Sequence, residues 1–318
     1  MTRQRDGAGH GDDVGPPGAS EGCTPLRLLH RVGALVVVDK PAGMLVHNSA
    51  WSGGPLETTA VQVVAELCGQ QVWPLHRLDR GTSGLLLFVT GREAMQPWRD
   101  ALATGAKDYV AVVRGRTLAP VCVRKPLQSE SGATQAAMTE LVPLVVAADE
   151  RVSLVAARIH SGRHHQVRRH LAHVHHPVCF DAYHGDSSFN RELRSRRGGP
   201  PLALHALSLR LRNPENGVPL ALVTPPSWLP WALELFGSTA VEAALRPFWP
   251  EGAQGPGPHG GSWQPDVSSE DDTALAGFDD VASSRRLGMA SARAVADSWP
   301  WPALTIQRPK PVSLDHRA

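Results

Sequence analysis

The segment His76–Gly84, followed directly by the apolar run Leu85–Val89, constrains this chain more than any other part of its sequence. Asp79 lies between Arg77 and Arg80, and the Gly-Thr-Ser-Gly that follows is typical of a turn. We therefore expect a strand over the apolar run, with the aspartate in the turn just before the strand begins. The flanking positive charges favour the ionised carboxylate. A salt-bridged surface loop is the alternative, because most arginine-flanked aspartates form such pairs.

The length and composition favour a soluble, cytoplasmic protein. The chain has 318 residues, of which 42% are hydrophobic, enough for a packed core. Four scattered cysteines (Cys23, Cys68, Cys122 and Cys179) form no CxxC pair, which suits reduced thiols. Since no apolar run approaches the length of a membrane span and the N-terminus lacks the apolar core of a signal peptide, we expect no membrane partner.

The net charge of +2 conceals an uneven distribution along the chain. Residues 24–237 carry 23 Lys and Arg against 16 Asp and Glu, whereas residues 1–23 and 238–318 are acidic. A basic centre suits a polyanionic partner such as RNA. Ordinary surface charge is the alternative explanation of this modest excess.

The distribution of apolar residues predicts one ordered domain between two tails. Residues 1–23 and 238–318 are rich in Gly, Pro, Ser and acids without periodicity, so we expect disordered tails. Within residues 24–237 the expected strands outnumber the helices and do not alternate regularly with them. The fold class is therefore α+β with a mixed sheet, and a Rossmann fold is excluded. Strands are expected at 34–38, 85–89, 109–113, 152–159, 208–211 and 221–223, and helices at 58–67, 94–102 and from 161 onward.

A second motif, Lys107–Gly115, places Tyr109 at the start of a β-rich run. A tyrosine ring there can stack on a nucleobase, while its phenol offers an oxygen for proton transfer. The charged residues before it favour a position at the rim of the sheet. A core tyrosine at a strand edge is the alternative.

A third motif, Ser161–His173, leads through a glycine into a helix start rich in Arg and His. Backbone N–H groups and guanidinium groups can bind a phosphate there together. Arg168 lies one turn beyond His164 and His165, so we expect it to reach back to a loop carboxylate such as Asp79. A solvated basic face is one alternative and a metal site is another.

The histidines of this motif make a metal site worth weighing. The pairs His160/His164 and His170/His173 have usable helical spacings. However, the interleaved arginines repel a divalent cation, and no acidic residue falls inside the cluster to complete a ligand set. We therefore predict no metal.

A fourth segment, Phe189–Gly199, contains Arg191, Arg194, Arg196 and Arg197. We interpret it as a mobile loop whose arginines clamp phosphates. A solvated charged face is the common alternative for such a run.

Together and in this order, these motifs resemble the RluA-type pseudouridine synthases. The resemblance implies one catalytic domain with a mixed, largely antiparallel sheet flanked by helices and loops. It also implies an RNA isomerase that uses no cofactor or metal and needs no obligate protein partner. It covers about residues 25–237 through five segments: Lys40–His47, His76–Asp79 with Thr82–Gly84, Lys107 with Tyr109, Gly162–Arg168, and Leu204–Ala206.

The resemblance also implies a role for each matching residue. Asp79 would start cleavage of the C1′–N1 glycosidic bond, and Arg168 would keep it ionised and aimed. Tyr109 would stack on a uracil flipped out of its stem, and Arg77 would fill the gap. The uracil would then rejoin the sugar through C5. The remaining candidates for holding RNA or shaping the pocket are Lys107, Arg163, His165, Gln166, Arg194, Arg196 and Arg197.

Further residues resemble the family members that modify the uridine at position 65 of tRNA, in the T stem. They are His47–Trp51, the doubled arginine within Gln166–His173, and His184–Asp186. We expect tRNA as the partner, with an rRNA-directed synthase or a non-catalytic RNA-binding protein as alternatives. Where relatives usually carry Gly-Asp after the helix, this chain has Phe180-Asp181, and we expect Phe180 to narrow the backbone space near the site.

Overall fold

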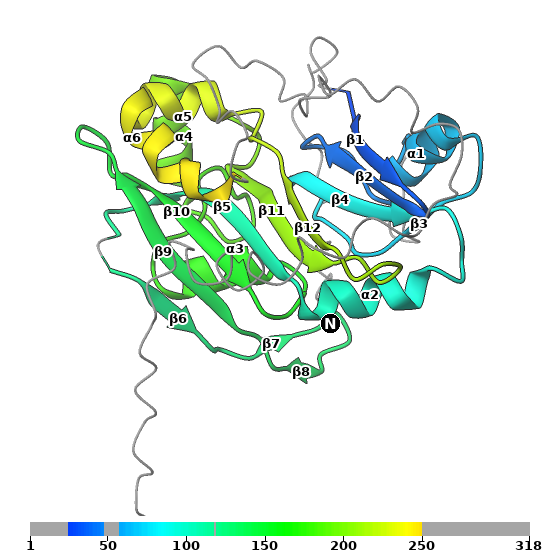
Figure 1. The fold of residues 1–318 in the computed structure, drawn as a ribbon. Helices are drawn as coiled ribbons and strands as arrows, with labels where there is room; N and C mark the ends of the chain where they lie inside the picture. The colour runs from blue at the N-terminus through cyan, green and yellow to red at the C-terminus, as the bar shows by residue number, and fades with distance from the viewer. Residues whose placement is uncertain (1–24, 48–56, 118, 250–318) are drawn as a thin grey trace, which may run out of the picture.

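The computed structural model describes residues 25–47, 57–117 and 119–249, drawn in colour in Figure 1. Residues 1–23 and 250–318 of the expected tails, and most of the segment His47–Trp51, lie outside the described residues. The expected boundary at Gly237 is wrong, because α6 (Ser238–Leu245) and a short 3-10 helix follow it. Val241 and Leu245 are buried in the largest hydrophobic cluster, so this extension is part of the folded domain.

A ten-stranded mixed sheet forms the centre of the domain, which confirms the α+β prediction. Its order is β1-β2-β4-β11-β5-β10-β9-β6, with β12 beside β11 and β3 beside β4. Among the described strand pairs, β4 and β11 are parallel and the others are antiparallel. The strands are β1 Arg27–Val32, β2 Leu35–Lys40, β3 Trp73–Pro74, β4 Ser83–Val89, β5 Ala106–Arg114, β6 Val121–Val123, β9 Thr139–Val146, β10 Val152–Ile159, β11 Leu204–Arg212 and β12 Pro219–Val223. A separate hairpin pairs β7 Leu127–Gln128 with β8 Thr134–Gln135.

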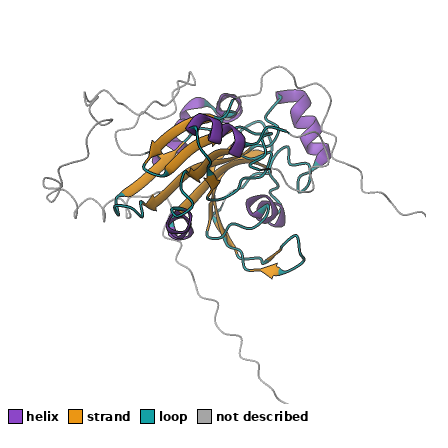
Figure 2. Ribbon diagram, turned by 90° about the vertical axis from the view of Figure 1, so that its right-hand side faces the viewer, coloured by secondary structure: helices purple, strands orange, loops and turns teal. Residues whose placement is uncertain are grey.

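The helices pack around this sheet. In Figure 1, α4, α5 and α6 gather on one side of the molecule, away from α1, and the turned view in Figure 2 shows helices on both sides of the sheet. Within the described part of the chain, we find no helix with the length and apolar character to cross a membrane. The other helices are α1 Ala60–Cys68, α2 Met95–Thr104, α3 Gln166–His173, α4 Ser187–Arg197 and α5 Leu229–Phe236.

Strand β4 is buried on both faces, which explains its unbroken apolar sequence. Because side chains alternate across a strand, Leu86 and Phe88 pack into a cluster with α1, whereas Leu85 and Leu87 pack into a second cluster with α2. The predicted strand is confirmed and begins at Ser83. The loop that carries the aspartate is therefore anchored to the most deeply buried part of the sheet.

A close crossing brings the start of β4 against β11. Ser83 pairs with His205, and Gly84 pairs with Ala206. Gly84 has a φ of +113°, and a Cβ atom there would overlap the carbonyl oxygen of Ala206. Only glycine fits this position, since it alone combines that φ with no side chain. The crossing sets β11 between β4 and β5, so the aspartate loop lies near the strand that carries Tyr109.

Two expected segments differ in the structure. The helix expected to begin at Ser161 begins at Gln166, after a turn in which His165 adopts a left-handed φ of 54°. The segment expected to be a mobile loop is helix α4. The side chain of Asp186 accepts a hydrogen bond from the backbone N–H of Phe189, an N-cap that starts this helix.

Candidate active site

The three residues predicted to carry the chemistry meet at one cavity of about 440 Å³. Asp79 comes from the loop between β3 and β4, Tyr109 from β5, and Arg168 from α3. The hairpin β7–β8 contributes Ser129 and Glu130 to the rim. The cavity therefore joins segments that are far apart in the sequence but adjacent in the fold.

Arg168 reaches the loop that carries Asp79, as predicted. Its Nη1 donates a hydrogen bond to Oδ2 of Asp79 over 3.1 Å. The Arg168 side chain is 7% exposed and that of Asp79 is 19% exposed, so the pair is shielded from solvent but still open to the cavity. A charge-assisted contact of this kind is stronger than a neutral hydrogen bond and holds the carboxylate in one orientation.

A second carboxylate, Asp181, holds the other edge of the Arg168 guanidinium. Arg168 donates from Nε to Oδ2 over 2.7 Å and from Nη2 to Oδ1 over 2.8 Å. The Asp181 side chain is fully buried and also accepts the backbone N–H groups of Tyr183 and His184. The guanidinium is thus clamped on one side and offers its free nitrogen to Asp79.

The contacts between Arg168 and Asp181 favour the charged forms of both side chains despite their burial. Burial alone would lower the pKa of Arg168, but its hydrogen bond with Asp181 and the charges of both aspartates raise that pKa. Burial likewise opposes ionisation of Asp181, yet the bonds from Arg168 and from the backbone lower its pKa. Buried charges persist when they are paired in this way.

Sequence reasoning missed Asp181 as a site residue. It was noticed only as the second residue of Phe180-Asp181, the place where the chain departs from its relatives. A usable signal existed, because an aspartate that follows the arginine-bearing helix can fold back onto it.

The expectation that Phe180 narrows the site is wrong. Phe180 does have the left-handed backbone that favours glycine, with a φ of 65°. However, its ring lies 4.2 Å from the Arg194 guanidinium and 5.6 Å from the Trp231 ring, and Phe180 does not line the cavity. The side chain points into the packing of α4 and α5, so the phenylalanine leaves the cavity open.

Tyr109 lies where two of the hydrophobic clusters meet, and it lines the cavity. Burial, and then the negative charge of Asp79, raise the pKa of its phenol above the ordinary value. The phenol therefore stays protonated at neutral pH. Such a ring can stack on a base and donate a hydrogen bond, but it is poorly suited to remove a proton as a phenolate.

His165 faces the same carboxylate. Its Nε2 lies 3.8 Å from Oδ2 of Asp79, and its Nδ1 is 3.0 Å from Nε2 of His184. Burial, together with the charges of Arg168 and its neighbouring histidines, lowers the pKa of His165 to about 4 even though Asp79 opposes the shift. His165 is thus neutral at pH 7 and is a hydrogen-bonding group beside the aspartate.

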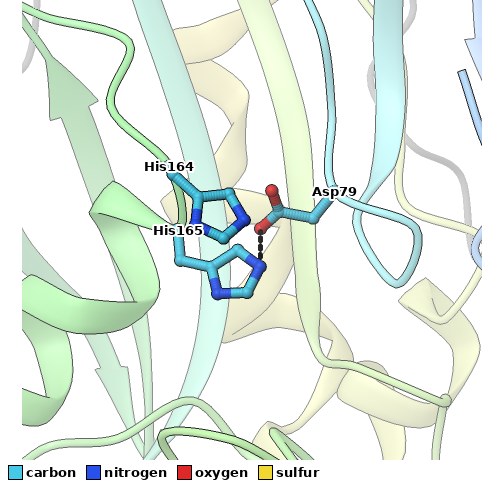
Figure 3. A group of neighbouring side chains, drawn as sticks. All are labelled: Asp79, His164 and His165. Atoms are coloured by element: carbon cyan, nitrogen blue, oxygen red, sulfur yellow. Dashed lines mark ion pairs between the residues drawn. The ribbon is translucent and has the colours of Figure 1, made fainter. Parts of the chain in front are cut away.

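The structure alters one of the two arguments against a metal site, the lack of an acidic residue near the histidines. Figure 3 shows His164 and His165 directed toward Asp79, and one ligand atom from each of the three lies within 4.8 Å of the others. The acidic residue missing from the sequence cluster is therefore supplied by a distant loop. Yet Oδ2 of Asp79 already accepts from the Arg168 guanidinium, whose charge opposes a cation. We propose no metal here.

The other predicted residues separate into two groups. Arg77, Arg163 and Gln166 line the cavity. Gln166 is buried and bonds to Ser161, to the backbone N–H of Arg163 and to Met138, so it shapes the cavity wall. The fold thus brings these three to the site.

Lys107 and the α4 arginines lie elsewhere. The Nζ of Lys107 donates to the carbonyl of Leu102 over 2.6 Å, at the end of α2, and Lys107 does not line the cavity. Arg194 bonds to backbone carbonyls, and both Arg196 and Arg197 pair with Glu150. These side chains brace the domain.

A buried lysine supports the loop that carries Asp79. Lys40 is fully buried, and its Nζ donates to the carbonyls of Pro41, Met44 and Arg80. Burial lowers its pKa to about 7, despite the opposing charges of Asp79 and a nearby aspartate. These bonds tie the backbone next to Asp79 to the segment after β2.

Residues 34–173 match the family model described as RNA pseudouridylate synthase. The tRNA pseudouridine synthase C of Yersinia pestis is 36% identical over 247 residues, which are 70% of this chain and 95% of that protein. That of Haemophilus ducreyi is 35% identical over 60% of this chain and 87% of that protein. That of Pectobacterium carotovorum is 35% identical over 63% of this chain, and the match spans 59% of that longer relative.

Solved structures show the same fold. The human RNA pseudouridylate synthase domain containing 4 matches with a TM-score of 0.53 at 21% identity, covering 65% of this chain and 91% of that chain. The human RNA pseudouridylate synthase domain containing 1 has a TM-score of 0.53 at 22% identity, covering 72% of this chain and 97% of that chain. At such identities the likeness concerns architecture alone.

Proposed function

The chain belongs to the RNA pseudouridylate synthase family, and from that premise we propose that it converts one uridine of tRNA to pseudouridine, with Asp79 starting the reaction. Members of this family are isomerases that act on RNA. The observation that carries the proposal is the chain of contacts from Asp181 through Arg168 to Asp79, at a cavity that Tyr109 also lines.

The proposed reaction rearranges one nucleotide without an added reactant. The C1′–N1 bond breaks, the uracil turns within the cavity, and a C1′–C5 bond forms while the C5 proton is lost and N1 gains one. Asp79 presents a carboxylate oxygen to the reacting nucleotide, and Arg168 donates a hydrogen bond that holds that oxygen in place. Electrostatic groups fixed before the substrate arrives are an effective source of rate enhancement.

Reaching the target requires the uridine to leave its stem. A base within a duplex is inaccessible to a cavity of this kind, so the nucleotide must flip out at a cost of a few kcal/mol. We propose that Tyr109 stacks on the flipped uracil and that Arg77, at the cavity wall, fills the space it leaves. Arg163, His165 and Gln166 would shape or contact the bound nucleotide.

The choice of tRNA is supported by the relatives named tRNA pseudouridine synthase C. The choice of the uridine at position 65 rests on the resemblance of His184–Asp186 and of the doubled arginine to family members that modify that position. Arg196 and Arg197 are about half exposed although they pair with Glu150, so we propose that they also contact RNA phosphates. Such a tRNA would be met in the cytoplasm, without a cofactor or an obligate protein partner.

The test is to incubate the purified full chain separately with unmodified tRNA and unmodified rRNA transcripts and to map pseudouridine at single-nucleotide level. The proposal predicts one new pseudouridine in the tRNA T stem, at position 65. Product in rRNA alone would instead favour the rRNA-directed alternative. Binding to RNA without any pseudouridine would favour the non-catalytic alternative and would contradict the proposal.

A further inference from the structure

The second of the two tyrosines stands outside the cavity with its ring exposed. Tyr183 is 66% exposed, the largest exposure of any big apolar side chain among the described residues. It follows α3 and precedes α4, in the turn that contains Asp181. A largely exposed aromatic residue beside a functional cavity is a candidate contact for a ligand.

The ring lies at the mouth of the site. Its centroid is 5.8 Å from the Arg168 guanidinium carbon and 6.1 Å from the centroid of the His165 ring. Both of those residues line the cavity, whereas Tyr183 does not. The tyrosine is therefore adjacent to the reacting groups but outside the space in which the target base would sit.

The backbone beneath the ring is fixed. The N–H groups of Tyr183 and His184 donate to Oδ1 of Asp181 over 2.9 and 3.0 Å. The same carboxylate clamps Arg168. The position of the tyrosine is thus tied to the position of the catalytic arginine, so a ligand group resting on this ring is placed relative to Asp79.

We propose that Tyr183 is a stacking platform for the nucleobase next to the flipped uridine. The inference rests on the proposed function. When a uridine leaves a stem, its neighbour loses a stacking partner, and an aromatic side chain replaces that partner in proteins that bind unstacked bases. A tyrosine suits this role because it offers a large rigid surface at a small entropic cost. Tyr109 then stacks on the target base inside the cavity, and Tyr183 stacks on its neighbour outside.

A stacking role, a phosphate contact and a structural role predict different changes when Tyr183 is replaced. Tyr183 carries no charge at neutral pH, so its loss should weaken RNA binding without changing the salt dependence, which reports phosphate contacts. A merely structural role would instead lower the stability of the protein, and the exposure of the ring argues against a large effect.

The experiment compares Tyr183→Ala, Tyr183→Phe and the control Val218→Ala in the full chain. Val218 is a second exposed apolar residue, at 57%, and does not line the cavity. The substrate is an unmodified tRNA transcript. The proposal predicts that Tyr183→Ala raises KM and Kd by about 5- to 100-fold, the range expected for one lost base stack. The single-turnover rate at saturating enzyme should change by less than about twofold. Tyr183→Phe and Val218→Ala should both behave like the wild type.

A second readout reports stacking itself. A T-arm hairpin with 2-aminopurine beside the target uridine should lose fluorescence on binding to the wild type and to Tyr183→Phe, and retain it with Tyr183→Ala. Unchanged KM in an active Tyr183→Ala protein, or equal quenching by all variants, would overturn the stacking role. Failure of the wild type to modify tRNA would be a different result, since it would reject the proposed function itself.

Discussion

Helices α3 and α4 are both rich in arginine, yet the fold uses their guanidinium groups differently. On α3, Arg168 is almost fully buried and lies between two carboxylates, one of which belongs to the loop before β4. On α4, Arg196 and Arg197 are about half exposed and share one carboxylate, Glu150. Similar runs of charge therefore give a buried ion-pair network at the cavity in one helix and a surface brace in the other.

The difference arises from what each helix is packed against. The first turn of α3 faces the aspartate loop across the cavity, and the chain after α3 returns Asp181 to the same arginine. No described carboxylate besides Glu150 and Glu192 pairs with the arginines at the end of α4. Burial with two partners makes Arg168 hard to replace, whereas exposure makes the α4 arginines replaceable.

The largest expected effect is a difference in the free energy of unfolding between arginine variants of the two helices. We expect Arg168→Ala to lower the free energy of unfolding by about 3–5 kcal/mol, because the buried Asp181 loses its partner. Arg196→Ala should cost less than about 1 kcal/mol, because the Arg196 side chain is half exposed and Glu150 keeps Arg197 as a partner. Urea titration followed by circular dichroism measures both. Equal losses would show that burial does not distinguish the two regions.

A second prediction tests the ion pair between Asp181 and Arg168 separately from the pair between Arg168 and Asp79. Asp181→Asn keeps the shape of the side chain but removes its charge, so Arg168 is held less firmly. We expect kcat to fall by about 100-fold with little change in KM, the size of effect that follows a small misplacement of a catalytic group. Single-turnover assays at saturating enzyme check this. A wild-type rate would mean that Asp79 alone positions the arginine.

Acid should weaken the ion pair between Asp181 and Arg168. The pKa of Asp181 is lower in the folded protein than its ordinary value, mainly because Arg168 bonds to it against the effect of burial. The stability that this carboxylate contributes is therefore present above its unfolded pKa of about 3.9 and is lost as the pH falls through the folded pKa. The difference in unfolding free energy between wild type and Asp181→Asn should be largest near neutral pH and shrink below about pH 4. A pH-independent difference would contradict this linkage.

Much of the site followed from local patterns, because strands and turns are encoded locally. The turn before β4 was predicted from its glycines and from the apolar run that follows. A strand through Tyr109 was also predicted, but β5 begins at Ala106, so Tyr109 is its fourth residue and does not open it. The contact between Arg168 and Asp79 followed from helical spacing, and the structure confirms it.

The parts that sequence reasoning missed depend on tertiary contacts. The pairing of Asp181 with Arg168 requires the chain after α3 to fold back, and the sequence shows only that an aspartate follows the helix, not that it returns to the arginine. Helix α4 was mistaken for a loop because its charges resemble a solvated segment, although Asp186 caps it. Lys107 belongs to a segment that resembles the family. However, its ammonium group donates to a backbone carbonyl at the end of α2 and does not line the cavity.

The smallest expected effect concerns RNA affinity at α4. Arg196→Ala should weaken tRNA binding only a few-fold and reduce the slope of log K against log salt by about one, the loss of one phosphate contact. Val218→Ala supplies the uncharged control. Filter binding at several salt concentrations gives the slopes, and an unchanged slope would leave Arg196 with its bracing role alone.

The most direct test of the whole account is the single-turnover rate of pseudouridine formation by Asp79→Asn, in a protein shown to fold and to bind tRNA. The account predicts a loss of at least about 1,000-fold, since the amide has the shape of the carboxylate but cannot act as an anion. A rate within about tenfold of the wild type would contradict it, because the carboxylate that Arg168 holds would then not be the group that starts the reaction.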